Sequence, residues 1–156
     1  MRTRPGAYGW IVRDGHVLLT YWSGKYWSGK NLMTGEDHGA WTLPGGGMEY
    51  GEQCEDTIRR EVAEETGYQV AVGPLLGVSN LFLPEAEVRD YGDDHHSIQV
   101  VHVAEIVGGD FLLEVGGTTI DARWFPLTER PPVQRVGLVN NANVFARAAG
   151  LGSFPD

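Results

Sequence analysis

Three glutamates near the end of one predicted helix constrain the fold of this sequence more than any other feature. A helix is expected from about Glu52 to Thr66, because Gly67 is a natural residue for a left-handed C-terminal cap. Successive helical residues turn by about 100°, so side chains at i, i+3 and i+4 share one face. The residues on that face are Glu61, Glu64 and Glu65, with Cys54 and Ile58 on nearly the same stripe. The carboxylates therefore extend a partly apolar face, which is expected to point inward.

Such a cluster of carboxylates is unfavourable without a compensating cation. Like charges at this spacing repel each other, and the helix dipole disfavours anions in the last turn. Burying uncompensated charge costs several kcal/mol. An all-oxygen ligand set favours a hard metal ion such as Mg²⁺ or Mn²⁺. The competing interpretation, a solvated acidic face paired with Arg59 and Arg60, leaves the shared stripe with Cys54 and Ile58 unexplained.

A glycine-rich segment, residues 43–52, precedes the helix at a fixed spacing. Its three consecutive glycines let the backbone approach a ligand closely and expose amide and carbonyl groups. Counted from Gly46, five residues lead to Glu52, and seven more lead to Arg60-Glu61-Val62-Ala63-Glu64-Glu65-Thr66-Gly67-Tyr68. This pattern resembles the Nudix box, Gly-x5-Glu-x7-Arg-Glu-U-x-Glu-Glu-x-Gly-U, in which U is a bulky apolar residue. Residues 46–68 match every fixed position, and Tyr68, in place of an aliphatic residue, is the only departure.

The resemblance continues loosely outside the box and implies both a fold and an activity. The entry Leu43-Pro44-Gly45-Gly46 and the later run from Ala122 to Leu127 are also similar to family members. The family fold is an α/β/α sandwich with a mixed β-sheet, and we expect a single domain of this kind over residues 1–156. The implied activity is Mg²⁺-dependent hydrolysis of a diphosphate that is linked to another moiety.

The resemblance also implies roles for individual residues. The expected metal ligands are Glu61, Glu64, Glu65 and the backbone carbonyl of Gly45. The expected catalytic residues are Glu61, Glu64, Arg60 and Glu52, with Arg60 orienting the carboxylates through ion pairs. Apart from the resemblance, the residues themselves suggest substrate contacts at Gly46 and Gly47, through close backbone approach, and at Trp22 and Trp27, through stacking. Helical arithmetic places Glu52 on the far side of the helix from Glu61, so an outer position is expected for Glu52 rather than direct ligation.

Trp22 and Trp27 belong to a tandem repeat, in which residues 21–25 and residues 26–30 are both Tyr-Trp-Ser-Gly-Lys. The plainest interpretation is a duplication that lengthened a surface loop, and segment 23–40 is predicted to be such an inserted loop. Either indole ring could stack on a nucleobase. Ordinary packing is the alternative for each of them.

Three acidic residues outside the box are further candidates for a ligand or a base: Asp94, Glu114 and Asp121. Each of them also fits a plain surface position. The adjacent His95 and His96 could bind zinc, but no cysteine or spaced histidine supports that site. His102 lies in a predicted central strand and is expected to be a hydrogen-bonded core residue.

The remaining pattern predicts one α/β domain. The expected strands are 7–13, 16–22, 41–43, 75–83, 97–107, 111–115 and 122–127, with Asp14-Gly15 as a hairpin turn. Residues 84–96 are expected to be loop, and a closing helix is expected over 134–149.

Charge and cysteine content limit the partners. The net charge of −9 argues against nonspecific binding to nucleic acid or to anionic membranes. No apolar run approaches the ~18 residues of a membrane span, and the N-terminus lacks the apolar stretch of a signal peptide. Cys54 is the only cysteine, which suggests a reducing, cytoplasmic compartment, and its surroundings do not suggest a nucleophile. Family members are often dimers, so a homodimer is a candidate assembly.

Three functions from different classes remain open at this stage. The first is a pyrophosphohydrolase of a nucleoside triphosphate, ADP-ribose or a nucleotide sugar. The second is a non-catalytic nucleotide sensor on the same fold, and the third is an isomerase of an isoprenoid diphosphate. An intact box favours the hydrolase, since the box contacts only the diphosphate that these substrates share.

Overall fold

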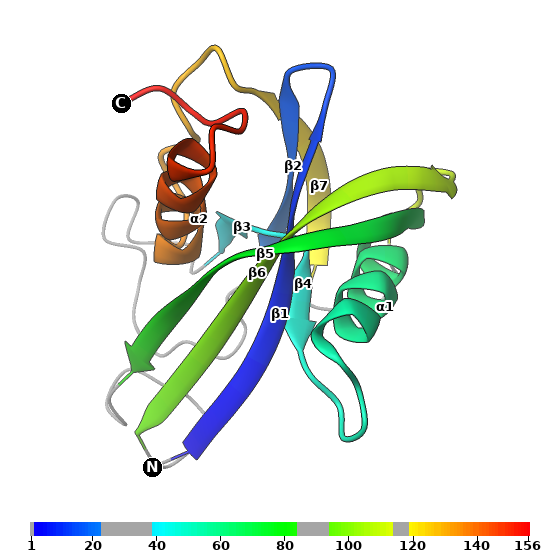
Figure 1. Cartoon of the computed structure of the whole chain (residues 1–156), viewed down its shortest axis with the longest axis vertical. Helices are drawn as coiled ribbons and strands as arrows, with labels where there is room; N and C mark the ends of the chain where they lie inside the picture. The colour runs from blue at the N-terminus through cyan, green and yellow to red at the C-terminus, as the bar shows by residue number, and fades with distance from the viewer. Residues whose placement is uncertain (1, 23–38, 84–93, 114–118) are drawn as a thin grey trace.

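A mixed β-sheet lies between two helices in the computed structural model, which describes residues 2–22, 39–83, 94–113 and 119–156. The elements are β1 (Arg2–Arg13), β2 (His16–Trp22), β3 (Ala40–Thr42), β4 (Gly45–Gly47), α1 (Cys54–Thr66), β5 (Tyr68–Leu83), β6 (His95–Gly109), β7 (Thr119–Pro126) and α2 (Gly137–Ala148). The seven strands follow the order β3-β2-β1-β6-β5, with β4 paired to β1 and β7 paired to β2. This architecture confirms the predicted α/β class with helices on either side of the sheet (Figure 1).

β1 joins the two halves of the sheet. Its residues from Arg2 to Ile11 run parallel to β6, and its last residues pair with β2 through the predicted Asp14-Gly15 turn. Both turn residues have positive φ, 52° and 72°, as a two-residue hairpin of this type requires. β6 lies between β1 and β5, so the predicted central strand is confirmed.

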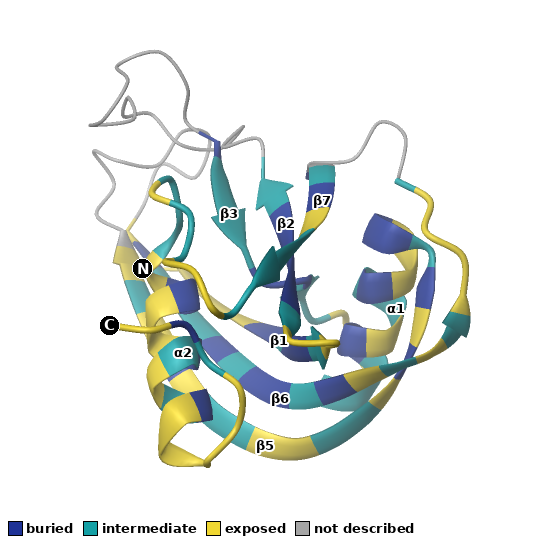
Figure 2. Cartoon of the chain, turned by 90° about the horizontal axis from the view of Figure 1, so that it is seen from above, coloured by how far each residue is buried: buried dark blue, intermediate teal, exposed yellow. Residues whose placement is uncertain are grey.

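Side chains that alternate along the strands form two cores, one beneath each helix. Ala7 and Ile11 of β1 join Ile58 and Val62 of α1 in one cluster, and Figure 2 shows buried segments of α1 and β1 in dark blue. Trp10, on the other face of β1, packs in the cluster under α2. The sheet is therefore covered on both faces, and neither of the two described helices is long and apolar enough to cross a membrane.

Several strand ends differ from the sequence prediction, among them the start of β1 at Arg2 rather than at residue 7, and three other differences are larger. Gly45–Gly47 was expected to be loop but forms β4, because it pairs antiparallel with β1. Residues 111–113 were expected to be strand but are irregular, because the backbone N–H of Leu112 bonds to the Thr66 carbonyl at the end of α1. The strand expected at 75–83 begins already at Tyr68 and carries irregularities in its register.

The box helix and the closing helix are confirmed with shifted ends. α1 begins at Cys54 rather than Glu52, since Gln53 is its N-cap and the Gln53 N–H donates to Asp56 Oδ2 at 2.9 Å. It ends at Thr66, and the C-cap residue Gly67 has the predicted left-handed conformation with φ 77°. The inserted loop over 23–40, apart from its last two residues, lies outside the described residues, as do Trp27 and Glu114. The loop expected over 84–96 lies outside them up to residue 93, and its end is wrong, since β6 begins at His95.

Candidate active site

The carboxylate face of α1 points partly inward, as predicted. Glu65 is only 5% exposed, and it follows the fully buried Ile58 and Val62 along the helix. The Glu61 side chain is 19% exposed and the Glu64 side chain 51% exposed. Glu61 and Glu65 are thus held against the sheet, whereas Glu64 lies at the rim.

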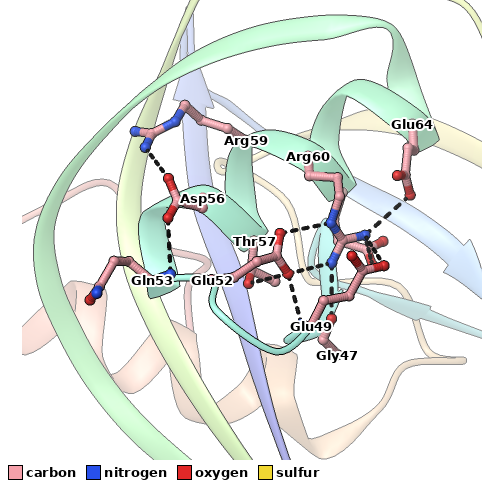
Figure 3. A network of polar contacts seen from close by, with 10 residues as sticks. Gly47, Glu49, Glu52, Gln53, Asp56, Thr57, Arg59, Arg60 and Glu64 are labelled. Carbon is pink, nitrogen blue, oxygen red and sulfur yellow. Dashed lines mark hydrogen bonds and ion pairs between the residues drawn. The ribbon is translucent and has the colours of Figure 1, made fainter.

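Arg60 organises the acidic cluster, and Figure 3 shows its guanidinium between acidic side chains. Its Nε and Nη2 donate to the two Glu52 oxygens, each at 2.8 Å. Its Nη1 donates to Glu61 Oε1 at 3.0 Å and more weakly to Glu64 Oε2 at 3.4 Å. Nη2 also reaches the Gly47 carbonyl at 3.1 Å. A single cation therefore ties the glycine strand to three carboxylates.

Glu52 is fixed by this arrangement and does not lie on the helix. Because α1 begins at Cys54, Glu52 belongs to the preceding turn, and the expected far-side position on the helix is wrong. Hydrogen bonds from Arg60, and then from the Glu49 N–H, lower the Glu52 pKa to about 2. The same contacts raise the pKa of Arg60 further above its usual value. Glu52 therefore positions Arg60, and its outer role at a metal site stays a prediction.

Glu65 accepts hydrogen bonds from two neutral donors. The Gly45 N–H donates to Glu65 Oε1 at 2.9 Å, and the Thr119 hydroxyl donates to Glu65 Oε2 at 2.7 Å. Thr119 begins β7, which lies 54 residues further along the chain than Glu65. Sequence reasoning missed Thr119, because no local pattern connects a strand's first hydroxyl to a helix so distant.

The glycines of β4 are required by what lies on either side of them. β4 pairs with β1 so that Gly6, Ala7 and Tyr8 face Gly47, Gly46 and Gly45. A Cβ atom on Gly46 would lie 2.7 to 3.0 Å from the Glu61 carboxylate, closer than ordinary contact. Gly45 has φ 144°, which side chains rarely allow. Only glycine therefore lets the strand lie this close to the acidic helix.

Tyr8 lies next to the glycine strand, because its backbone pairs with Gly45 across β1 and β4. Burial, and then the negative charge of Glu65, raise the pKa of the Tyr8 hydroxyl to about 12. A hydrogen bond from the Gln99 side chain acts in the opposite direction. Tyr8 therefore stays neutral, with its ring packed in the cluster beneath α2.

The oxygen-rich donor set fits a hard divalent cation. The glutamates supply carboxylate oxygens, and the missing Cβ of Gly46 leaves space beside Glu61. Across the described residues, no three acidic, histidine or cysteine side chains already converge as a complete ligand group. Glu61 and Glu64 turn toward Arg60 instead, and Glu65 turns toward Gly45 and Thr119.

Several other candidates have been given local partners by the fold. Asp121 accepts from the Ala122 N–H and pairs with Arg123 Nε, both at 2.8 Å. The His102 ring bonds through Nδ1 to the Gly73 carbonyl at 2.9 Å, which confirms the predicted core histidine. Asp94 is exposed just before β6.

The two adjacent histidines have separate partners. His95 contacts the Ser97 hydroxyl through Nε2, and His96 contacts Asn80 Oδ1 through Nε2, each at 2.9 Å.

Cys54 lies half-buried on α1. Its burial, and then the negative charge of Glu55, raise the pKa of its thiol, which agrees with an unreactive cysteine.

Comparison with known proteins places this geometry in a family. The model of the NUDIX domain matches residues 2–146. The chain belongs to the NUDIX family. An ADP-ribose pyrophosphatase of Methanocaldococcus jannaschii is 36% identical over 93 residues, which are 60% of this chain and 50% of that protein. The nucleoside triphosphatase NudI of Salmonella schwarzengrund is 40% identical over 93 residues, 60% of this chain and 59% of that protein. The matched stretch thus spans little more than half the length of these relatives.

Solved structures of NUDIX proteins confirm the fold. A NUDIX hydrolase from Nitrosomonas europaea superposes with a TM-score of 0.67 at 18% identity, covering 99% of this chain and 93% of that one. A MutT protein from Methanosarcina mazei superposes with a TM-score of 0.65 at 23% identity, covering 94% and 95%. The mixed sheet between two helices is therefore the NUDIX architecture.

Proposed function

We propose that this NUDIX chain is a Mg²⁺-dependent pyrophosphohydrolase that cleaves a diphosphate linkage in a nucleoside diphosphate derivative. The observation that carries the proposal is the Arg60-centred carboxylate cluster packed against a strand of three glycines. The substrate classes in view are nucleoside triphosphates, ADP-ribose and nucleotide sugars. The names of the two relatives above fall within the same range.

The metal ligands would be Glu61, Glu64, Glu65 and the Gly45 carbonyl. Mg²⁺ is the proposed ion, and Mn²⁺ would fit the same oxygen donors. When bound, such an ion neutralises phosphate oxygens and lowers the pKa of a coordinated water. The chain's net charge of −9 makes neutralisation of this kind necessary for a substrate that is itself anionic.

The chain's own residues would orient the carboxylates and take the proton from the attacking water. Arg60 holds Glu61 and Glu64 in place, and Glu52 in turn fixes the guanidinium of Arg60 with two hydrogen bonds. A carboxylate of Glu61 or Glu64 accepts the proton of the attacking water. The glycines of β4, Gly46 and Gly47 among them, let the diphosphate approach the backbone closely.

Trp22 would contact the nucleoside part of the substrate. It ends β2 directly opposite Thr119, the residue whose hydroxyl donates to Glu65. Side chains alternate along a strand, so Trp22 shares its face with Leu18, which packs in the core beneath α1. An indole at this position can stack on a base next to the cluster. Trp27 stays a prediction for the same role.

The test is hydrolysis of a panel of nucleoside triphosphates, ADP-ribose and nucleotide sugars, with Mg²⁺ or with chelator. Glu65→Gln keeps the shape of the buried side chain but removes its charge, so turnover should fall at least 100-fold while the fold persists. Glu129→Gln is the matched control, because Glu129 is exposed after β7. Turnover that persists in chelator, or unchanged turnover by Glu65→Gln, would contradict the proposal.

Two other outcomes have defined meanings. Mg²⁺-dependent binding of a nucleotide without turnover would favour the nucleotide sensor over the enzyme. A rearranged product without cleavage would favour the isomerase.

Two further proposals concern the compartment and the assembly. The single cysteine supports a reducing, cytoplasmic compartment. The candidate assembly is a homodimer, and gel filtration would distinguish it from a monomer.

A further inference from the structure

β5 is an edge strand of the sheet, and it carries no charged side chain. It pairs with β6 alone among the described strands, and Figure 2 shows it along the outer margin of the sheet. Residues 66–84, which include the whole strand, contain none of the chain's 12 basic and 21 acidic residues. Soluble proteins usually protect an exposed edge strand with charged side chains, which prevent it from pairing with another chain. This edge lacks that protection.

The second half of β5 is regular, whereas its first half is interrupted. Register irregularities in its pairing with β6 continue as far as Gly77. Pro74, which cannot donate a backbone hydrogen bond, lies among them. From Gly77 to Leu83, seven residues pair without a break with residues 95–101 of β6, and Asn80 is at their centre. This segment can therefore accept a further strand in a regular ladder.

α2 holds one face of the regular segment in place. Asn141 Nδ2 donates to Ser79 Oγ at 2.7 Å. A Cβ on Gly77 would lie 2.5 Å from the ring of Phe145, so the helix and the strand are in close contact. A strand that is already ordered loses little conformational entropy when another strand pairs with it.

The opposite face of the segment is largely apolar and open to solvent. Side chains alternate along a strand, so Val78, Asn80 and Phe82 point away from α2. The exposed fraction is 49% for Val78 and 69% for Phe82. Phe82 stacks on the ring of His96 with 4.5 Å between the ring centroids, and His96 Nε2 contacts Asn80 Oδ1 at 2.9 Å. Two large apolar side chains are therefore available for contact beside the edge of the sheet.

We propose that two copies of this chain form a dimer by pairing residues 77–83 of β5 antiparallel, about a two-fold axis at Asn80. An axis at the centre of the regular segment places Phe82 of each copy directly opposite Val78 of the other. Asn80 then lies opposite Asn80 of the second copy, where the two amides can hydrogen-bond. One continuous sheet would run through both copies.

The charge of the chain favours a second copy as the occupant of this edge. Each copy has a net charge of −9, so two copies repel each other wherever acidic surfaces meet, and pairing along an uncharged strand keeps those surfaces apart. A basic protein would be attracted to the acidic surfaces instead, because β5 offers it no opposite charge. The pairing gives the candidate homodimer a surface, and it does not depend on hydrolysis.

Analytical ultracentrifugation over a range of protein concentrations measures the Kd of the dimer. Phe82→Glu buries an unpaired carboxylate twice, by symmetry, and should raise the Kd about 100-fold or more. Val133→Glu is the matched control. Val133 is 71% exposed and lies near Arg135, which bridges to β3 at the opposite edge of the sheet. It should leave the Kd within about twofold of the wild type. A wild type that stays monomeric up to its highest soluble concentration would overturn the proposal, as would an unchanged Kd for Phe82→Glu.

A double variant tests the register. Val78→Lys alone should also weaken the dimer, because it places an unpaired ammonium opposite Phe82. Val78→Lys combined with Phe82→Glu places opposite charges face to face in both symmetry-related pairs. The double variant should therefore dimerise at least about tenfold more tightly than Phe82→Glu. A double variant that dimerises no better than Phe82→Glu would refute the pairing of Phe82 with Val78.

A cysteine at the two-fold axis gives an independent measurement. Opposite residues of paired antiparallel strands have Cα atoms about 4.5 to 5.5 Å apart, within the range that a disulfide spans. In a Cys54→Ser background, Asn80→Cys should form a disulfide-linked dimer under mild oxidation. Val133→Cys in the same background should stay monomeric, because it lies far from the axis. No cross-link by Asn80→Cys, or equal cross-linking by both variants, would refute the axis.

Ultracentrifugation needs no substrate, so the dimer and the hydrolase can fail separately. A dimer that hydrolyses nothing would contradict only the proposed function. A monomer that hydrolyses nucleotides would contradict only the pairing of β5. Thermal unfolding of Phe82→Glu should resemble that of the wild-type monomer, since the side chain that it replaces is mostly exposed.

Discussion

Gly46→Ala tests the site with a single added methyl group. The ideal Cβ would lie 2.7 Å from the carboxylate carbon of Glu61, whereas ordinary contact begins at 3.4 Å. The carboxylate must therefore move by about 0.7 Å (3.4 − 2.7). Metal sites tolerate deviations of only about 0.2 Å in ligand distance, and a 1 Å misplacement can cost ~100-fold in rate. We expect kcat to fall by about 30- to 100-fold, with a weaker apparent affinity for Mg²⁺.

The substitution should leave the fold intact. Gly46 is not among the glycines with positive φ, so alanine can adopt its backbone conformation. Its closest neighbour is the far end of a flexible side chain, which can move without disturbing the core. Thermal unfolding should therefore differ little from the wild type.

The assay is steady-state hydrolysis of the best substrate over a Mg²⁺ titration. Gly137→Ala is the matched control, since no atom lies within 4 Å of its added Cβ. A folded Gly46→Ala protein with kcat and Mg²⁺ dependence within twofold of the wild type would refute the placement of Glu61 in the metal site.

Three further predictions address the partners of the cluster. Thr119→Val removes a donor from Glu65 and should weaken Mg²⁺ affinity by about 10- to 100-fold in an activity titration; an unchanged Mg²⁺ midpoint would contradict this role. The Glu52 pKa is lowered to about 2, so its carboxylate stabilises the folded state above its ordinary pKa of 4.5, and this contribution is lost as the pH falls toward 2. Urea unfolding of Glu52→Gln should accordingly depend less on pH in that window, and parallel curves for wild type and variant would exclude the effect. Burial raises the Cys54 pKa, so iodoacetamide at pH 8 should modify it more slowly than free cysteine, and Cys54→Ser should retain full activity; rapid alkylation with inactivation would argue for a functional thiol.

The elements that the sequence predicted well are those determined by local chemistry. Gly67 ends α1 in the left-handed conformation because only a residue without Cβ adopts it at low cost. Asp14-Gly15 forms the expected turn because aspartate and glycine both tolerate the positive φ that this turn requires. The inward orientation of Glu61 and Glu65 follows from helical geometry alone. Each of these features depends on residues a few positions apart.

The features that the sequence did not predict depend on contacts between distant segments. Gly45–Gly47 becomes a strand because β1 pairs with it, and three glycines in a row carry no strand propensity of their own. The hydroxyl of Thr119 meets Glu65 across 54 residues, which no spacing rule covers. The position of Glu52 depended on where α1 begins, and the Gln53 cap moved that start by two residues. Helix boundaries are set by such caps, so a two-residue shift changed the inferred position of Glu52.

The charge of the cluster determines how it must respond to metal. Its charged members carry five carboxylates against one guanidinium: Glu49, Glu52, Glu61, Glu64, Glu65 and Arg60. A site with this excess of negative charge repels phosphate and attracts a divalent cation, so metal binding should stabilise the folded state. A ligand at 100 times its Kd adds about 2.7 kcal/mol to the free energy of unfolding, which should raise Tm by several degrees in a chain of 156 residues.

This stabilisation requires no substrate and no turnover, so it tests the metal site separately from the chemistry. Differential scanning calorimetry with Mg²⁺ and with chelator should show the rise for the wild type and for Glu129→Gln. Glu65→Gln should lose most of it, because it removes a proposed ligand charge from the buried side of the cluster. Equal Tm values for the wild type at millimolar Mg²⁺ and in chelator would contradict the metal site. They would mean that Arg60 and the neutral donors around it compensate the negative charge of the carboxylates without a metal ion.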